Sequence, residues 1–219
     1  MTTIYSTNPQ GTPEWRAERA GKLTASRFKD LTATLKNGTP AASRATVIAA
    51  CTVERLTGHP DDGVFVTEAM RRGTELEPVA REAYVHHTGN AVALAGFAQR
   101  TDCPYVGASV DGLVGGDGMI EIKCPASMQK HLDALLTGAH AVEYQAQIQG
   151  CLWITGRQWC DAVSYDPRFG ELALAIVRVQ RDEAFITTLA ATCAAANDEV
   201  DENVKTLKAQ IAKSSDWGA

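Results

Sequence analysis

Two acidic residues and a lysine lie close together in the segment Ala108–Pro125, which reads ASVDGLVGGDGMIEIKCP. A glycine-rich bend separates Asp111 from Glu121, and Lys123 follows Glu121 by two residues. Side chains alternate between the two faces of a strand, so Glu121 and Lys123 share one face and the apolar neighbours share the other. The bend can fold the chain back, which predicts that Asp111 lies beside Glu121.

Paired carboxylates of this kind are hard oxygen donors that suit Mg²⁺ or Mn²⁺, and the main-chain carbonyl of Ile122 can supply a further oxygen. A nearby lysine can orient or deprotonate a water molecule, or stabilise negative charge at phosphorus. These are the parts of a metal-assisted phosphodiester hydrolase. The alternative is a solvent-facing hairpin on which Glu121 and Lys123 form an exposed ion pair of little energetic value. The apolar flanks of MIEIKCP favour a central strand, where charges are costly unless they are used, but the hairpin alone leaves both interpretations open.

Two expected helices carry further polar candidates. Gln147 lies at the edge of an apolar stripe in the segment 143–155, so we expect its amide to be partly buried and to need partners. A default alternative is a core-edge glutamine bonded to backbone. Around Leu76, both Glu75 and Glu77 flank the apolar stripe, and the helical period does not choose between them. The stripe near Gln147 contains Tyr144, Ile148, Cys151, Leu152 and Thr155.

Near the start of the chain, Arg19 and Ser26 bracket the residues AGKLTA. An arginine and a hydroxyl beside a helix start can cradle a phosphate group. A surface salt bridge with a helix cap is the plainer alternative. The pair His86–His87 lacks any matching metal-ligand spacing and is interpreted as a helix end before Gly89.

Composition excludes several classes of protein. The 219 residues are 45% hydrophobic and 21% charged, with a formal net charge of −5. No run of 18 apolar residues predicts a membrane span, and the N-terminus lacks the pattern of a signal peptide, so we expect a cytoplasmic protein. The six scattered cysteines predict reduced core thiols. Residues 1–60 contain eight Lys and Arg against four acids, which leaves a basic region despite the acidic total.

The order of expected elements predicts an α/β fold with a mixed sheet flanked by helices and an antiparallel portion. We expect one domain over 1–219, with a core of about 14–180. Pro78 lies inside one expected helix and predicts a kink, or two helices meeting there. The loop residues Asp61–Asp62 are interpreted as solvated, and Trp153 and Trp159 as core. The expected helices are 14–20, one from Thr24, 43–58, 67–89, 127–138, 142–156 and about 182–212, and the expected strands are 91–99, 105–114, 119–124, 158–167 and 171–180.

Taken in order, five motifs resemble the lambda exonuclease family, the YqaJ-like viral recombinases within the PD-(D/E)xK nucleases. They are EWRAERAGKLTASRF, AMRRGTELEPVAREAY, GASVDGLV with IEIKCP, EYQAQIQGCLWITG, and SYDPR. The resemblance covers most of the chain before about residue 182. It implies a restriction-endonuclease-like core. It also implies an Mg²⁺-dependent nuclease, with Mn²⁺ as a substitute, that degrades one strand of duplex DNA from its 5′ end.

Carried over by motif, the resemblance makes Asp111, Glu121 and Glu77 metal ligands, together with the Ile122 carbonyl, and Lys123 the catalytic lysine. It thereby selects Glu77 over Glu75. The remaining implied roles are Gln147 and Tyr144 on the active-site helix, Arg19, Ser26 and Ser109 in a pocket for the terminal 5′-phosphate, and Met70 as an apolar wedge at the end base pair. One departure is Val110, which stands where the family has proline before the motif aspartate.

The resemblance further implies a ring of three subunits around DNA, and a single-strand annealing protein as partner in phage-type recombination in the host cytoplasm. The basic lining of such a ring is expected to include Arg16, Arg19, Lys22 and Arg27. Two alternatives use the same residues. One is an endonuclease that needs no DNA end, and the other is an inactive protein that binds DNA ends as a recombination scaffold.

Overall fold

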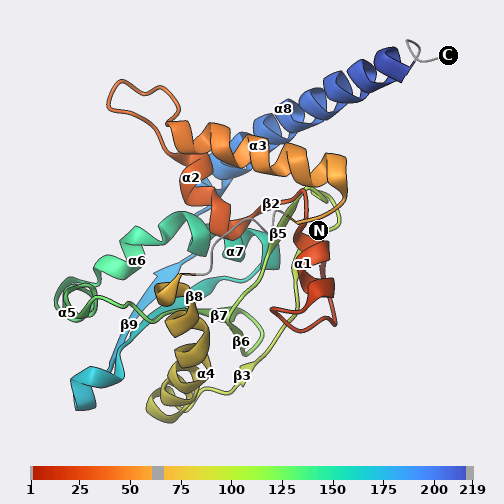
Figure 1. Cartoon of the computed structure of the whole chain (residues 1–219). Helices are drawn as coiled ribbons and strands as arrows, with labels where there is room; N and C mark the ends of the chain where they lie inside the picture. Colours follow the sequence, from red (N-terminus) through yellow and green to blue (C-terminus); the bar gives the residue numbers. More distant parts are fainter. Residues whose placement is uncertain (1, 61–66, 216–219) are drawn as a thin grey trace.

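The computed structural model describes residues 2–60 and 67–215 and confirms the mixed α/β class, with two mixed sheets flanked by helices (Figure 1). Asp61–Asp62 lies outside the described residues. Among the described residues, no helix combines the length and the apolar character needed to cross a membrane. The elements are β1 (Thr3–Tyr5), α1 (Pro13–Arg19), β2 (Leu23–Thr24), η1 (Ala25–Arg27), α2 (Phe28–Thr32), α3 (Ala42–Thr57), α4 (Glu68–Thr88), β3 (Val92–Ala93), β4 (Ala98–Arg100), β5 (Val106–Ala108), β6 (Gly112–Val114), β7 (Gly118–Lys123), α5 (Met128–Thr137), α6 (Ala139–Glu143), α7 (Gln145–Thr155), β8 (Trp159–Tyr165), η2 (Pro167–Leu172), β9 (Leu174–Gln180) and α8 (Glu183–Ser215).

The larger sheet has the order β3-β6-β7-β8-β9, and the smaller sheet has the order β1-β4-β5-β2. In the larger sheet β7 and β8 run parallel, with Glu121 opposite Ala162, and the other pairs are antiparallel. The strand β7 is therefore central, with five of its six residues buried. This position agrees with the expected central strand and rules out the solvent-facing hairpin.

The two faces of the larger sheet bury different helices. Ile120 and Ile122 of β7 pack with Ala80 and Tyr84 of α4 in one core cluster. Met119, from the opposite face of the strand, joins the second cluster with residues of α2, α3, α7 and α8. The odd-numbered residues of β7 therefore face α7, as period-two alternation requires.

The expectation that 91–99 and 105–114 are each a single strand is wrong. The segment 105–114 forms two short strands, and they belong to different sheets: β5 pairs with β4 and β2, whereas β6 pairs with β3 and β7. The segment 91–99 divides in the same way into β3 and part of β4. Ser109 and Asp111 lie at the crossing between the sheets, where the chain leaves one ladder before it enters the other.

Three expected helices differ in the structure. The segment from Thr24 is not one helix, because Thr24 is the last residue of β2 and the 3-10 helix η1 precedes α2. The segment 142–156 contains the end of α6 and then α7, with Tyr144 between them at φ −105°, ψ 16°. At Pro78 the chain continues as one helix, α4, and does not divide into two helices, which was one of the two expectations. The expected helix ends at Gly58 and Gly89 are confirmed, since both glycines adopt left-handed conformations.

Reduced thiols are confirmed, because all six cysteines are free and five are buried. Trp153 is buried, as expected. Trp159 is half-buried and packs against the cluster that α4 covers.

A glycine allows α7 to approach α2 closely. A Cβ atom at Gly150 would lie 2.3 Å from Cδ2 of Phe28, which is fully buried, whereas a Cβ atom at Gly73 in α4 would meet open space. Both glycines occupy helices, so the two positions share the helical advantage of alanine.

We predict opposite effects of alanine at these two positions. Gly150→Ala should lower the free energy of unfolding by about 1–3 kcal/mol because it overpacks the core. Gly73→Ala, the matched control, should raise it by about 0.5–1 kcal/mol. Urea unfolding followed by circular dichroism measures both, and equal shifts in the two variants would contradict this account of the contact.

Candidate active site

The hairpin of β6 and β7 brings the two acids of the motif together. Gly112 pairs with Ile120 across the hairpin, and the residue before Gly112 is Asp111. Its carboxylate Oδ2 accepts a hydrogen bond of 2.6 Å from the main-chain N–H of Ile122. The expectation that the bend places Asp111 beside the Glu121 segment is confirmed.

Glu121 is a carboxylate enclosed in the core, with 2% of its surface exposed. Its Oε1 accepts hydrogen bonds of 2.6 Å from Lys123 Nζ and 2.6 Å from Gln147 Nε2. Its Oε2 is buried and has no hydrogen-bond partner. Gln147 is half-buried, as the helical period predicted, but its partner is the acid and not the backbone.

Lys123 carries the positive charge of this cluster. Although burial acts to lower it, the neighbouring charges of Glu121 and Asp111 hold the pKa of Lys123 above its usual value. The Nζ atom also lies 4.7 Å from the centroid of the Tyr144 ring. A lysine that is held protonated can donate to a water molecule or to a phosphate oxygen, so the arrangement favours positioning over proton abstraction among the roles considered above.

Glu77 of α4 approaches the same acids and is paired with an arginine. Arg81, one helical turn further on, forms an ion pair with the Glu77 carboxylate and donates a 2.9 Å hydrogen bond from Nε to the carbonyl of Asp111. Burial raises the pKa of Glu77, and the charge of Glu121 raises it further against the opposing charge of Arg81. Glu77 is therefore in electrostatic reach of Glu121.

The carboxyl of Asp111 is partly buried beside the same charges. Burial raises its pKa well above the usual value, and the charge of Glu121 raises it further, against the opposing effect of Lys123. Three acids in one low-dielectric region thus carry more negative charge than Lys123 and Arg81 balance comfortably.

Two of the three acids present donors that suit a divalent cation. Asp111 and Glu121 offer carboxylate oxygens, and the unpartnered, buried Oε2 of Glu121 is the kind of group that a hard cation satisfies. Across residues 2–60 and 67–215, however, no three His, Cys, Asp or Glu side chains converge closely enough to hold a metal ion. Glu77 forms an ion pair with Arg81, so in the described structure Asp111 and Glu121 have donors that fit a cation, while Glu77 is held by the arginine.

A second group of polar residues surrounds Ser109, two residues before Asp111. The Ser109 Oγ accepts hydrogen bonds of 2.9 Å from Arg19 Nη1 and 3.0 Å from Trp15 Nε1. The Arg19 guanidinium lies 4.3 Å from the centroid of the Trp15 ring. Burial and the nearby charge of Arg27 lower the pKa of Arg19 to about 10, so Arg19 is still a cation at neutral pH.

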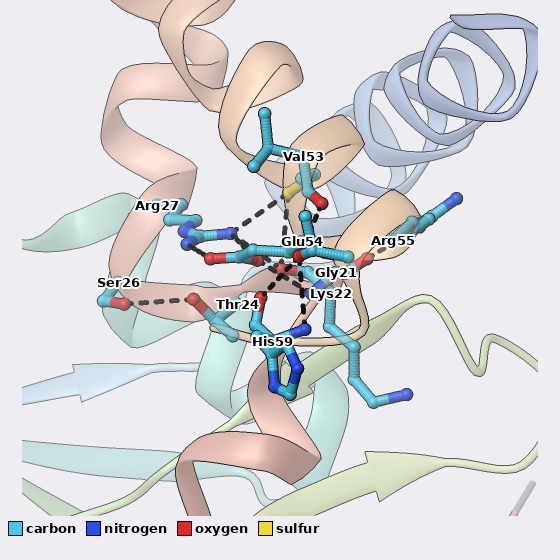
Figure 2. A network of polar contacts seen from close by, with 11 residues as sticks. Gly21, Lys22, Thr24, Ser26, Arg27, Val53, Glu54, Arg55 and His59 are labelled. Carbon is cyan, nitrogen blue, oxygen red and sulfur yellow. Dashed lines mark hydrogen bonds and ion pairs between the residues drawn. The ribbon is translucent and has the colours of Figure 1, made fainter. Parts of the chain in front are cut away.

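Ser26, the third expected member of this group, lies near Arg19 in sequence but bonds elsewhere. Its hydroxyl lies 3.1 Å from that of Thr24, and Figure 2 shows the two side chains directed at one another. A cavity of about 160 Å³ lies beside Arg19, and three arginines and one acid are among the residues that line it. A pocket with this charge suits an anion. Its lining residues are Arg16, Arg19, Ala20, Thr24, Arg27, Glu54 and Pro60.

The remaining sequence candidates occupy varied positions. Met70 is 49% exposed in the first turns of α4, a location open to a ligand. Glu75 is also exposed, whereas Glu77 is the acid that faces the cluster, so the choice between them that the resemblance implied agrees with the geometry. His86 and His87 lie in the last turn of α4, as expected.

Two residues of the site were not expected from the sequence. Arg81 contacts both Glu77 and the backbone of Asp111, and its i,i+4 spacing from Glu77 was the available signal. Trp15 donates to Ser109, a contact that joins residues 94 apart and leaves no local signal, whereas its stacking against Arg19 has the i,i+4 spacing of a helix.

The chain is similar to a known protein family and to several solved structures. Residues 14–158 match the YqaJ-like viral recombinase domain. The alkaline exonuclease LHK-Exo from Laribacter hongkongensis is 41% identical, with a TM-score of 0.83, and the match covers 92% of this chain and 99% of that one. A second structure, LHK-Exo in complex with dAMP, is also 41% identical over the same shares, with a TM-score of 0.84.

A phage-related exonuclease from Haemophilus somnus 129PT is 17% identical, with a TM-score of 0.68 over 85% of this chain and 96% of that chain, and shares the fold. No curated protein matches the chain.

The shared position of these acids predicts that the charged carboxylate of Asp111 destabilises the metal-free protein. The folded-state pKa of Asp111 is raised, so its contribution to stability is complete at low pH and is lost as the pH rises through that value. Without divalent cations at pH 8, Asp111→Asn should therefore raise the free energy of unfolding by at least about 1 kcal/mol, as measured by urea unfolding. The substitution removes the charge, while the amide oxygen can still accept the hydrogen bond from the Ile122 N–H.

The difference should shrink as the pH falls toward the ordinary aspartate range. Asp117→Asn, at an exposed residue of the same hairpin, is the matched control. It should leave the free energy of unfolding unchanged both at pH 8 and at the lower pH. A less stable Asp111→Asn protein at pH 8 would contradict the assignment of mutual repulsion.

Proposed function

Because the chain belongs to the YqaJ-like viral recombinase family and is an alkaline-exonuclease-like nuclease, we propose that it is an Mg²⁺-dependent exonuclease of double-stranded DNA. In this proposal it removes nucleotides from the 5′ end and leaves a 3′ single strand. Mn²⁺ would substitute for Mg²⁺. The observation that carries the proposal is the buried Glu121 carboxylate, which is bonded to Lys123 and Gln147 and lies beside Asp111.

The ion would be held by Asp111, Glu121 and the Ile122 carbonyl, with Glu77 as a further ligand. When bound, it would supply a Lewis acid that polarises the phosphate and lowers the pKa of a water molecule. The protonated Lys123 would donate to the attacking water or to a non-bridging phosphate oxygen. Gln147 would hold the Glu121 carboxylate in place, and the Tyr144 ring would limit the positions open to Lys123.

The direction of cleavage is proposed from the Arg19 group. A terminal phosphate is a dianion, and Arg19, with the hydroxyls of Ser109 and Ser26, would bind it beside the acids. Ser109 and Asp111 are two residues apart, so a bound end would place the adjoining phosphodiester near the acidic cluster. The LHK-Exo structure with dAMP, a nucleoside monophosphate, supports this class of ligand. Met70 would act as a wedge at the end base pair.

Assembly and partners complete the proposal. Three copies would surround the duplex, and a single-strand annealing protein would receive the exposed strand in the host cytoplasm. Exposed apolar side chains of α5 and α6 support a contact between subunits, and they include Leu136 at 72% and Val142 at 75% exposure.

The proposal predicts degradation that depends on both a DNA end and a divalent cation. With Mg²⁺, the protein should release a 5′-end label from linear duplex as a mononucleotide at early times, whereas a 3′-end label should stay on a strand that shortens progressively. A chelator should abolish release, because the carboxylates then hold no ion. Labelled duplexes resolved on a denaturing gel measure the direction.

Covalently closed circular DNA distinguishes an exonuclease, which needs a DNA end, from an endonuclease, which does not. Cleavage of the circle would favour the endonuclease. Lys123→Ala is the inactive control and should still bind ends, whereas Lys130→Ala, which removes an exposed lysine paired with Glu143, should leave the rate unchanged. No release by the wild-type protein with Mg²⁺ or Mn²⁺ would leave the scaffold alternative.

Arg19 predicts a preference for phosphorylated ends. Arg19→Ala should reduce kcat/KM on 5′-phosphorylated duplex about tenfold or more, because a charge-assisted contact with the phosphate is lost. The rate on 5′-hydroxyl duplex should barely change. Arg44→Ala, which removes an arginine paired with Glu199 outside this region, is the control. If Arg19→Ala keeps the wild-type preference, the pocket is elsewhere.

A further inference from the structure

We infer that Glu54 is a positioning residue for the pocket that holds the terminal phosphate, an inference that rests on the proposed function. Glu54 comes from α3, outside every motif considered above, and is 3% exposed. Figure 2 shows its carboxylate between the turn that follows α1 and the short helix η1. These two segments carry Arg19 and Ser26.

The first contact of Glu54 holds the turn that carries Arg19. Its Oε2 accepts a 2.8 Å hydrogen bond from the main-chain N–H of Gly21. The turn itself is closed by a 3.1 Å bond from the Lys22 N–H to the carbonyl of Arg19. Arg55, the next residue on α3, donates 2.8 Å from Nε to the Gly21 carbonyl. The peptide groups on both sides of Gly21 are therefore bound by side chains of α3. These bonds fix the position of the turn at the end of α1, where Arg19 lies.

The second contact holds the segment that carries Ser26. Arg27 directs its fork at the same carboxylate, with Nη2 2.6 Å from Oε1 and Nη1 3.0 Å from Oε2. Arg27 also donates to the Lys22 carbonyl at 3.3 Å. One buried carboxylate thus ties the Arg19 turn to the residue after Ser26. A bidentate pair of this kind has a defined geometry that a single hydrogen bond does not provide.

The charges give a test that separates position from electrostatics. Among the described residues, the charged side chains that line the cavity beside Arg19 are Arg16, Arg19, Arg27 and one acid, Glu54, a net of +2. Removing the acid charge raises this net to +3, which by itself would strengthen the binding of an anion. A loss of the hold on the Arg19 turn would weaken that binding. The two explanations therefore predict opposite signs for Glu54→Gln.

We expect weaker binding. In buffer with a chelator, Glu54→Gln should bind 5′-phosphorylated duplex about tenfold less tightly than the wild-type protein, the effect of one misplaced charge-assisted contact. Its affinity for 5′-hydroxyl duplex should stay within about twofold of the wild-type value. Fluorescence anisotropy of dye-labelled duplexes measures both. With Mg²⁺, KM on phosphorylated ends should rise and kcat should hold, because the acidic cluster is untouched.

The matched control is Glu199→Gln. Glu199 of α8 receives a similar two-bond fork from Arg44 of α3, away from the pocket, so its loss should leave both affinities unchanged. The double variant Arg27→Gln/Glu54→Gln returns the net charge of the cavity to +2 and removes the unpaired arginine. It should still bind phosphorylated ends more weakly than the wild-type protein, and it replaces the single variant if that protein does not fold.

Tighter or unchanged binding of phosphorylated ends by Glu54→Gln, or an equal loss for both kinds of end, would overturn the positioning role. A wild-type protein without any phosphate preference would instead contradict the proposed end pocket, and the two failures are thereby distinguished.

Discussion

Glu121 is a charged group on the central strand of the larger sheet, and a carboxylate in that environment needs partners because water cannot reach it. Lys123 comes from the same strand face and Gln147 from the helix that covers it. The strand, the helix α7 and the break at Tyr144 must therefore hold one relative position. An oxygen of Glu121 nevertheless stays without a partner in the described structure. The fold thus tolerates an incompletely satisfied charge at the position where the proposed chemistry needs one.

Local periodicity was enough to predict part of this site. The shared face of Glu121 and Lys123 and the partial burial of Gln147 follow from the strand and helix repeats alone. Glu77 required the family resemblance, since the helical period left Glu75 equally placed. The division of 105–114 between two sheets was missed because both strands are three residues long, and only their partners decide which ladder each joins. Contacts such as Trp15 with Ser109 depend on tertiary packing and have no local signal.

Some arginine and lysine side chains of this protein donate hydrogen bonds to its own backbone. Their positive charge is therefore less available to a nucleic acid than the sequence suggests. Arg27 binds Glu54 and the Lys22 carbonyl, and Lys22 donates to the carbonyl of Pro104. Two of the four basic residues expected to line a DNA channel, Lys22 and Arg27, thus donate to backbone carbonyls, while Arg16 is exposed. Residue counts therefore overstate the positive charge that a nucleic acid would meet, and the pocket beside Arg19 matters more than the regional total.

The crossing of the chain between the two sheets has a geometric consequence. Ser109 directly follows β5 of the smaller sheet, Asp111 directly precedes β6 of the larger sheet, and Val110 between them is fully buried. Two residues of extended chain span at most about 7 Å. On the proposed function, Ser109 anchors the terminal phosphate and Asp111 lies beside the cleaved bond. The backbone between them therefore limits the distance between these two points. The size of the released product would then be set by two peptide units, independently of the sequence of the DNA.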